Sequence, residues 1–379
     1  MRILLVTTND YLHHPLPSRH HHIFEELALR GHDIYVPHFH ISDGEARKTN
    51  LHVIEATKVP SKDPMLHYLL NAPYHHHVFD QAITKYDIDV VVASHILAGT
   101  AAIHAAKLHG VRVVYDLKDW YPSSAEVYYT NPAVKFALRT GVWKVLRHNL
   151  RHSDVITTVS PSLAARLFSK KFFSVEVIPN GVDTVLFRPL EKSKCCKELH
   201  IGISEQDFII GYVGAIERWL DFKTLIEALQ WILPKKPRAK LLIVGDALFT
   251  SQMAELRQLI TMNGLDERVI FTGKKPYDTL PQYIGAMDIC TIPMGEVMRD
   301  IALPNKYFEY AACGKPILST PIPDIIKVAG KGVFFYDSAE EFADIVLSLD
   351  SGDYICEPNG GCSWVSRADD FERVLKRYS

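Results

Sequence analysis

Two successive runs of alternating strands and helices constrain the fold of this chain more than any other feature. In the first run, short apolar segments rich in β-branched residues are separated by stretches with helical periodicity, among them Arg19–Arg30 and Thr100–His109. Near-continuous apolar strands of this kind are typical of a parallel sheet that helices cover on both faces. The strands expected in this run are Ile3–Thr7, Asp33–Val36, Asp89–Ala93, Val111–Tyr115, Val155–Val159 and Val175–Ile178.

The alternation stops at the polar segment Asp183–Glu205, which has no clear period and predicts a linker. A second run follows, with expected strands at Phe208–Val213, Lys240–Val244, Val269–Phe271, Ile289–Ile292, Ile317–Ser319 and Val333–Phe335. We therefore expect an α/β protein with two doubly wound, Rossmann-like domains at 1–185 and 186–362, a loop at Gly352–Gly361 and a C-terminal helix at 363–379. Such sheets bind ligands at the carboxyl ends of their strands, which predicts an inter-domain cleft.

The segment Leu303–Thr320, LPNKYFEYAACGKPILST, carries the most specific chemistry. Pro304 suits the start of a helix, where free N–H groups and the helix dipole make an anion site. Lys306 adds a positive charge, and Glu309 lies one turn further on the same face. Gly314 ends the helix before an apolar strand. A cation and a carboxylate side by side suit a ligand that carries both a diphosphate and a hydroxylated ring.

Three further segments sit at strand ends of the first domain. They read IPNGVD at Ile178–Asp183, SDVITTVSPS at Ser153–Ser162 and DLKDWYP at Asp116–Pro122. Together with the lysine, the "EY" glutamate and the "GKP" of Leu303–Thr320, they resemble the motifs of glycosyltransferase family 4. This resemblance covers nearly the whole chain, to about residue 335.

The resemblance implies the GT-B fold and transfer of a sugar from a nucleoside diphosphate sugar, with retention, to a glycan, lipid-linked or small-molecule acceptor. It implies no metal and no cofactor besides the donor substrate, because basic groups and a helix N-terminus neutralise the leaving diphosphate. The donor is expected on the second domain and the acceptor on the first. The donor-binding residues it indicates are Gly214, Arg218, Gly245, Asp246, Gly273, Lys274, Pro304, Asn305, Lys306 and Glu309.

The chain departs from the family pattern at three positions. Ala215 and Leu220 stand where most members have basic residues, so Arg218 becomes the candidate cation of that loop. Ile301 stands eight positions before Glu309, where most members have an acid. These departures keep open a non-catalytic GT-B protein that binds sugar nucleotides. A sugar-nucleotide epimerase is a third interpretation, which the motif around Glu309 opposes. A dehydrogenase is disfavoured, because no GxGxxG follows the first strand.

The expected catalytic residues are His95 in the first domain and Glu309 in the second. His95 follows the strand Val90–Ala93, at a position where the family often has a histidine near the transferred sugar. Arg19, Asp116 and Asp119 are expected on the acceptor side. The alternative for Arg19 is an exposed arginine at a helix start.

The chain has nineteen histidines, including the runs His20–His22 and His75–His77. Successive residues of a helix point about 100° apart, so neither run converges on one ion. We therefore expect partly exposed helix histidines and no metal site. Six scattered cysteines without a CxxC pair indicate a reducing compartment, which predicts a cytoplasmic protein.

The formal net charge of −2 gives no general attraction to nucleic acid, so we expect no nucleic-acid partner. The sequence has no apolar run of the ~18 residues that a membrane span needs. Two basic segments, FSKKFF at Phe168–Phe173 and PKKPRAK at Pro234–Lys240, are candidates for peripheral contact with anionic lipid at the inner face of the membrane, and solvated loops are the alternative.

Overall fold

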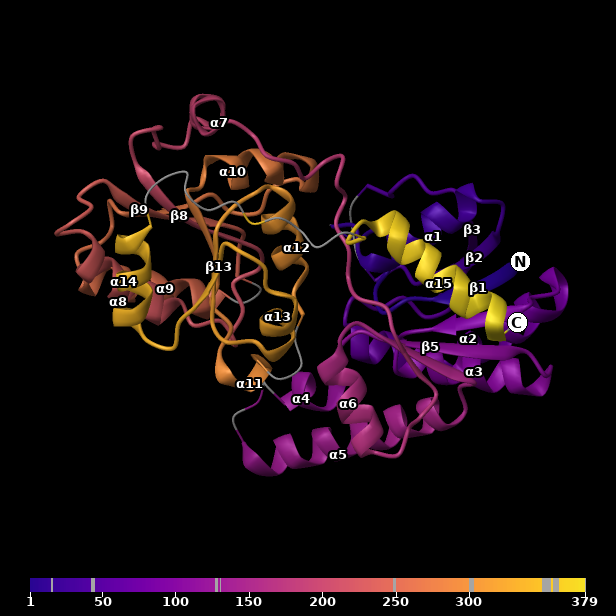
Figure 1. The fold of residues 1–379 in the computed structure, drawn as a ribbon. Helices are drawn as coiled ribbons and strands as arrows, with labels where there is room; N and C mark the ends of the chain where they lie inside the picture. Colours follow the sequence, from indigo (N-terminus) through magenta and orange to yellow (C-terminus); the bar gives the residue numbers. More distant parts are fainter. Residues whose placement is uncertain are drawn as a thin grey trace. The chain divides into compact units, whose positions relative to one another are not determined.

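The computed structural model describes residues 1–14, 16–41, 45–126, 129, 131–247, 250–299, 303–349, 356 and 361–378. The chain forms two compact units (Figure 1). Unit 1 is Met1–Pro179 with Trp364–Ser379, and unit 2 is Asn180–Ser363. The first boundary therefore falls at Pro179, six residues before the expected end of the first domain, and the C-terminal helix belongs to unit 1. Most of the predicted loop Gly352–Gly361, as well as Asp300 and Ile301, lies outside the described residues.

Unit 1 contains a sheet whose described strands are all parallel, in the order β3-β2-β1-β4-β5-β6-β7. The apolar side chains of β1 and β4 are fully buried because helices cover both faces of the sheet. Ile3 pairs with Ile34 on one side and with Val90 on the other. The strands are β1 (Arg2–Val6), β2 (Asp33–His38), β3 (His52–Glu55), β4 (Val90–Ala93), β5 (Arg112–Leu117), β6 (Val155–Thr158) and β7 (Val175–Val177).

Side-chain caps fix where helices of unit 1 begin. Asp63 accepts a hydrogen bond from the Leu66 N–H at the start of α2, and Ser160 does the same for Leu163 at α6. The helices are α1 (Arg19–Leu29), α2 (Pro64–Tyr86), α3 (Leu97–Leu108), α4 (Tyr121–Glu126), α5 (Pro132–Arg151), α6 (Pro161–Ser169) and α15 (Trp364–Tyr378).

Unit 2 contains a second sheet of parallel strands, in the order β10-β9-β8-β11-β12-β13. Its strands are β8 (Phe208–Val213), β9 (Ala239–Val244), β10 (Val269–Phe271), β11 (Ile289–Ile292), β12 (Ile317–Ser319) and β13 (Val333–Phe335). Its helices are α7 (Lys192–Leu199), α8 (Phe222–Ile232), α9 (Thr250–Met262), the 3₁₀ turn η1 (Tyr277–Thr279), α10 (Leu280–Ala286), α11 (Glu296–Arg299), α12 (Asn305–Ala312), α13 (Pro323–Val328) and α14 (Ala339–Ser348). Within the described ranges, every helix is too short or too polar to cross a bilayer.

Two elements differ from the sequence prediction. Strand β3 was not expected, because only the middle of HVIE is apolar and the strand lies half-exposed at the sheet edge. The predicted linker Asp183–Glu205 contains helix α7, so the expectation of an irregular segment there was wrong. Cys195 and Cys196 are buried, and Lys192 forms an ion pair of 2.6 Å with Asp288. This short helix is held by tertiary contacts, which a search for periodicity over eight residues does not detect.

The C-terminal helix α15 completes the core of unit 1, where it lies beside α1 (Figure 1). The Phe371 ring meets the Phe24 ring edge-on at 5.1 Å, and Phe371 is fully buried. Arg30, the C-cap of α1, also forms ion pairs with Asp369 and Glu372 of α15. Residues from the two ends of the chain therefore share one hydrophobic cluster.

We expect Phe371→Ala to destabilise unit 1 by about 3–5 kcal/mol, because it removes a fully buried ring and leaves a cavity. Val365→Ala on the same helix is the matched control. Its side chain is largely exposed, so it should change stability by less than about 0.5 kcal/mol. Chemical denaturation of both variants measures the difference, and equal effects would contradict the role of α15 in the core.

Candidate functional site

Three glycine turns lie side by side at the carboxyl edge of the unit 2 sheet. Gly214 follows β8, Gly245 follows β9 and Gly273 follows β10, with φ of +143°, +148° and +69°. A Cβ on Gly245 would lie 1.9 Å from the carbonyl oxygen of Gly214. A side chain is therefore excluded at Gly245, which leaves the backbone open to a ligand at this point.

Helix α12 is fastened to the end of β8 beside these turns. The Tyr310 hydroxyl accepts a 2.8 Å hydrogen bond from the Val213 N–H. Lys306 Nζ lies 5.0 Å from the centre of the Tyr212 ring and 2.9 Å from where a Cβ on Gly214 would stand. The structure thus brings together Gly214 and Lys306, two of the predicted donor-binding residues that are far apart in the sequence.

Two carboxyl groups interact with Lys306, from Glu309 and Glu217. Burial raises the pKa of Glu309 to about 7, against the opposing charge of Lys306. Burial also raises the pKa of Glu217, and it lowers the pKa of Lys306 while both carboxylates favour the charged amine. One carboxyl oxygen of Glu217 is buried and has no hydrogen-bond partner among the described residues. Such a cluster is a candidate binding site because its polar groups gain partners from a ligand.

Glu217 is a site residue that the sequence analysis did not predict. It lies three positions after Gly214, in the segment GYVGAIERWLDF. The only local signal is an acidic residue soon after a strand-end glycine. Its proximity to Lys306 depends on the neighbouring β8 and β11 and on the helix that follows Pro304, which no local pattern encodes.

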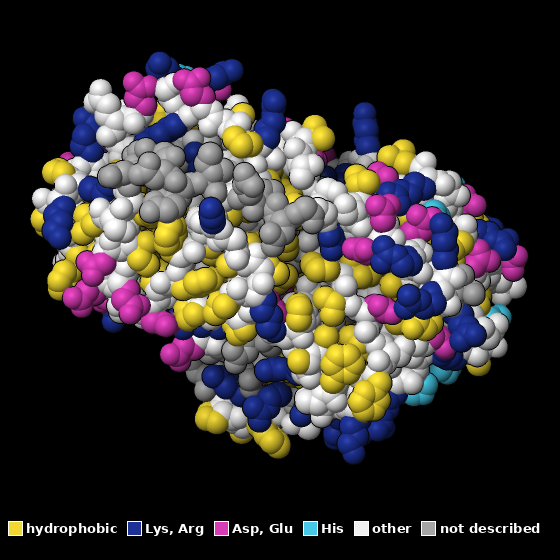
Figure 2. All heavy atoms as spheres, in the orientation of Figure 1, with side chains coloured by type: hydrophobic (Ala, Val, Ile, Leu, Met, Phe, Trp, Pro, Cys, Tyr) yellow, Lys and Arg dark blue, Asp and Glu magenta, His cyan; other side chains and the backbone are white. Residues whose placement is uncertain are grey.

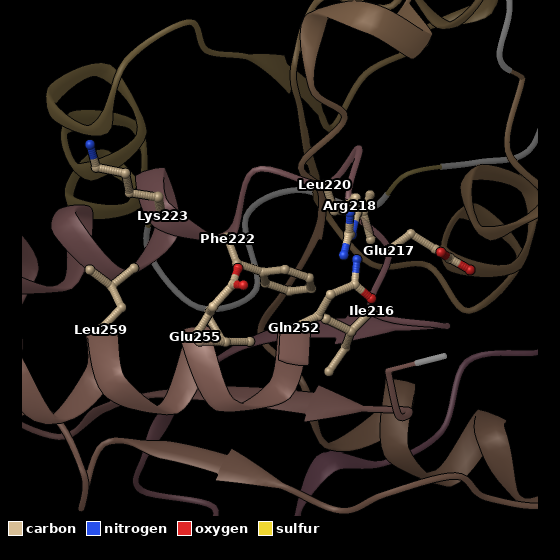
Figure 3. A pocket seen from close by; sticks show the side chains of 10 residues that line it. Ile216, Glu217, Arg218, Leu220, Phe222, Lys223, Gln252, Glu255 and Leu259 are labelled. Atoms are coloured by element: carbon tan, nitrogen blue, oxygen red, sulfur yellow. The ribbon is translucent and has the colours of Figure 1, made fainter. Parts of the chain in front are cut away.

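Arg218 follows Glu217 in the chain, and Gln252 of α9 lies beside it (Figure 3). They line a cavity of about 460 Å³ together with Glu217, Phe222 and Glu255, and the carboxylate of Glu217 points away from Gln252. With its amide oriented to satisfy both partners, Gln252 donates to the Ile216 carbonyl at 3.1 Å and accepts from the Arg218 N–H at 2.9 Å. Arg218 itself is exposed, so its role in donor binding stays a prediction.

The other predicted donor residues lie along the same edge. Asp246 is exposed, and its carboxylate accepts a hydrogen bond from the Ala247 N–H at 2.8 Å. Lys274 is exposed after Gly273. Pro304 is the N-cap of α12 and Asn305 is its first residue, so both stand where the helix offers free N–H groups.

His95 caps the first turn of α3 in unit 1. Its Nδ1 accepts hydrogen bonds from the N–H groups of Leu97 and Ala98, at 3.1 and 3.0 Å. Its ring also packs on Tyr68, with centroids 3.7 Å apart, and burial lowers its pKa to about 3. Since Nδ1 acts as an acceptor, the neutral ring carries its proton on Nε2 and can donate it to a ligand oxygen.

The predicted acceptor-side pair Arg19 and Asp116 forms a buried ion pair. The guanidinium contacts both carboxylate oxygens at 3.2 Å, and Arg19 Nη1 donates to the Ile178 carbonyl at 2.9 Å. Arg19 is 2% exposed, so the alternative of an exposed helix-start arginine is wrong. The pair ties α1 to β5 and to the IPNGVD turn. Asp119 is exposed nearby, and an acceptor-side role for these residues stays a prediction.

The expectation of partly exposed histidine runs was wrong for His20, His21 and His75, which are buried. His20 Nε2 lies 2.9 Å from the Asp116 carboxylate. His21 pairs with Ser18 in a capping box and with the Tyr11 carbonyl. Internal hydrogen bonds therefore engage both ring nitrogens of His21 but only Nε2 of His20, whose buried Nδ1 has no partner among the described residues. His76 and His77 retain some exposure.

Two family models match successive parts of the chain. The model described as "Glycosyltransferase Family 4" matches residues 20–186, and the one described as "Glycosyl transferases group 1" matches residues 207–351.

Curated relatives match at low identity. A 2-deoxystreptamine N-acetyl-D-glucosaminyltransferase of Streptomyces fradiae is 27% identical over 179 residues, which cover 45% of this chain and 40% of that protein. A GDP-mannose-dependent alpha-(1-6)-phosphatidylinositol monomannoside mannosyltransferase of Mycobacterium tuberculosis is 28% identical over 234 residues, which cover 59% and 60%. The chain thus spans about half the length of the curated relatives it matches.

Solved structures share the architecture over the whole chain. A sucrose-phosphate synthase of Thermosynechococcus elongatus superposes with a TM-score of 0.76 at 19% identity, covering 99% of this chain and 98% of that one. The HepE protein of Anabaena, in complex with UDP, gives a TM-score of 0.66 at 20% identity, covering 100% and 95%. The likeness confirms the predicted fold of two Rossmann-like domains.

The interaction between Glu309 and Lys306 predicts a measurable change in titration. We expect the Glu309 carboxyl to titrate near the pKa of about 7, and Lys306→Met to raise that pKa further, because the ammonium charge favours the carboxylate. NMR of ¹³C-labelled glutamate follows the carboxyl group. The exposed Lys331 offers the control, since Lys331→Met should leave the titration of Glu309 unchanged. A lower pKa in the Lys306 variant would contradict the proximity of the two groups.

Proposed function

Because the chain belongs to the family 4 glycosyltransferases, we propose that it transfers a sugar from a nucleoside diphosphate sugar to an acceptor, with retention at the anomeric carbon. The observation that carries this proposal is the position of Lys306, which interacts with the carboxyl groups of Glu217 and Glu309 and lies against the Gly214 turn. This arrangement offers a cation and helix N–H groups to a diphosphate, and carboxyl groups to hydroxyls.

The donor binds on unit 2 in this proposal. Lys306 and the start of α12 hold the diphosphate and neutralise the charge that develops on it as the glycosidic bond breaks. Glu309 accepts a hydrogen bond from a ribose or sugar hydroxyl, and its raised pKa lets the carboxyl also donate one near neutral pH. This charge compensation requires no divalent cation, so transfer should proceed without metal.

His95 acts on the sugar side in this proposal. Its Nδ1 is already occupied by the N–H groups of α3, and a low pKa keeps the ring neutral. The Nε2–H therefore positions a sugar or acceptor oxygen as a hydrogen-bond donor and does not act as a general base. The acceptor, a glycan, a lipid-linked sugar or a small molecule, binds on unit 1.

The choice of donor is tested with a panel. HepE was solved with UDP, and the mycobacterial relative is named as GDP-mannose-dependent, so UDP and GDP sugars come first. Calorimetry measures binding, and release of the free nucleoside diphosphate measures hydrolysis or transfer, each with and without excess chelator. Binding without any turnover would favour the non-catalytic alternative that Ala215 and Leu220 motivate.

We expect Lys306→Met to weaken binding of the preferred nucleoside diphosphate by about 1.5–3 kcal/mol, the scale of a hydrogen bond to a charged group. Lys331→Met, at an exposed lysine of the same unit, should leave the dissociation constant unchanged. Melting temperatures of both variants exclude unfolding as the cause. Equal affinity of the Lys306 variant and the native protein would remove Lys306 from the donor site.

A basic surface of unit 1 suits contact with an anionic membrane. Helix α5, Pro132–Arg151, contains five Lys or Arg residues and no Asp or Glu. Figure 2 shows Lys, Arg and hydrophobic side chains together along the lower rim, where Figure 1 places α5 and α6. Phe136 and Phe173 are 63% and 75% exposed on this surface. Basic residues interspersed with exposed aromatic rings are typical of segments that lie at a membrane interface.

Basic and aromatic residues also line two cavities of this surface. One, of about 470 Å³, has Trp120, Trp143, Arg139 and Arg166 among its lining residues. The other, of about 320 Å³, includes the two lysines of FSKKFF. By contrast, two of the four basic groups of PKKPRAK are occupied within unit 2, since Arg238 and Lys240 both pair with Asp207. We therefore assign peripheral lipid contact to the α5–α6 surface and not to PKKPRAK.

We expect Lys170→Gln with Lys171→Gln to lower partitioning onto vesicles that contain anionic lipid about thirtyfold, since each basic residue near the surface contributes about 1 kcal/mol. Both lysines are exposed. The control is Lys194→Gln with Lys223→Gln, which removes the same charge from exposed positions of unit 2. Vesicle sedimentation measures both. Equal losses in the two variants would show a general charge effect and no surface of this kind.

A further inference from the structure

Two histidines and one aspartate outside the histidine runs converge at the carboxyl edge of the unit 1 sheet. Asp10 and His13 belong to the segment that connects β1 to α1, and His38 is the last residue of β2. Their side-chain atoms come together although His38 is separated from the other two by the whole of α1. The site proposed for the donor uses none of these residues.

The three potential ligand atoms form a compact triangle. His13 Nδ1 lies 3.1 Å from His38 Nε2, and Asp10 Oδ2 lies 3.5 Å from the first and 3.7 Å from the second. Zinc bonds to nitrogen and oxygen are about 2.0–2.1 Å long, so the edges of a tetrahedral site are about 3.3 Å. The three distances between the potential ligand atoms, from 3.1 to 3.7 Å, bracket this edge length.

Hydrogen bonding among the three residues does not account for the arrangement. The contact between the two imidazole nitrogens can share one proton. The carboxylate is too far from both nitrogens for a good hydrogen bond. Asp10 Oδ2 accepts only a long bond of 3.3 Å from the Ile41 N–H among the described residues, and its Oδ1 has no partner there.

Burial makes the unpaired charge of the Asp10 carboxylate costly. The Asp10 side chain is fully buried, and that of His38 is 7% exposed. A buried carboxylate normally has an ion-pair partner or a metal ion.

A further carboxylate lies near the other ring nitrogen of His38. His38 Nδ1 lies 3.6 Å from Glu55 Oε1 on the neighbouring strand β3. Histidines that bind metals commonly present the second ring nitrogen to a carboxylate, which fixes the tautomer and the direction of the ring. Glu55 lies on that side of the ring, although 3.6 Å is too long for a good hydrogen bond, and Nε2 of His38 is the nitrogen that faces His13 and Asp10.

We propose that Asp10, His13 and His38 bind one divalent transition-metal cation, with Zn²⁺ as the type that this donor set fits best. Two imidazoles and one carboxylate provide three ligands, and a water or an exogenous ligand fills the fourth position. The bound cation would fasten the β1–α1 segment to the end of β2. This site is independent of the metal-free chemistry proposed for unit 2, because no residue is shared.

The test uses the whole protein after dialysis against a chelator. Titration with Co²⁺, followed by visible absorption, should show one tightly bound equivalent with the bands of a low-coordinate site, and Zn²⁺ should displace it. His13→Gln should weaken this binding at least thirtyfold. The matched control is His148→Gln with His152→Gln, which removes an exposed pair of histidines from α5 and should leave the binding unchanged.

Two further measurements keep the outcome decisive. Zinc should raise the melting temperature of the native protein and of the α5 control but not that of His13→Gln, while nucleotide binding stays equal in all three. X-ray absorption of the zinc-loaded native protein should show two imidazoles, which tests the site even if His13→Gln does not fold. No stoichiometric Co²⁺ binding, unchanged affinity in His13→Gln, or fewer than two imidazoles around zinc would overturn the proposal.

Discussion

The close packing of backbone at the ends of β8 and β9 is the constraint on which the candidate donor site depends. The carbonyl of Gly214 occupies the space where a side chain on Gly245 would stand, and Lys306 occupies the space beside Gly214 itself. A Cβ on Gly245 would collide with the backbone of Gly214, and a Cβ on Gly214 would displace the end of the Lys306 side chain. The bare backbone at Gly214 therefore leaves room for the Lys306 ammonium, whose charge opposes the effect of burial on the pKa of Glu309.

Buried charged side chains have different roles in the two units. In unit 1, Arg19 and Asp116 form a bidentate contact at the heart of the fold, and the ion pair and hydrogen bonds hold the pKa of Asp116 below its usual range. That charge is balanced internally, which suits a structural role. In unit 2, Lys306 faces two carboxyl groups whose pKa values are raised, so the balance is incomplete until a ligand arrives. Incomplete compensation is the property that distinguishes a binding site from a structural ion pair.

Much of the fold follows from the sequence, because strands buried on both faces are nearly all apolar and the helices between them have clear caps. The edge strand β3 and helix α7 escaped prediction, since both are short and depend on neighbours for their stability. For the site, the motif around Lys306 predicted a cation and a carboxylate on one helix face. Glu217 escaped because its approach to Lys306 depends on the order of strands in the sheet, and strand order is a long-range property.

The histidines also show that a local sequence pattern does not reveal which side chains come together. Runs of adjacent histidines attract attention in a sequence, yet helical geometry spreads them, and the structure uses His20 and His21 for hydrogen bonds within unit 1. Convergence instead occurs between His13 and His38, which are separated by a helix and share no local pattern. A parallel sheet gathers the residues that follow its strands at one edge, whatever their separation in the chain. Both the cation cluster of unit 2 and the Asp10 cluster of unit 1 are consequences of that single topological fact.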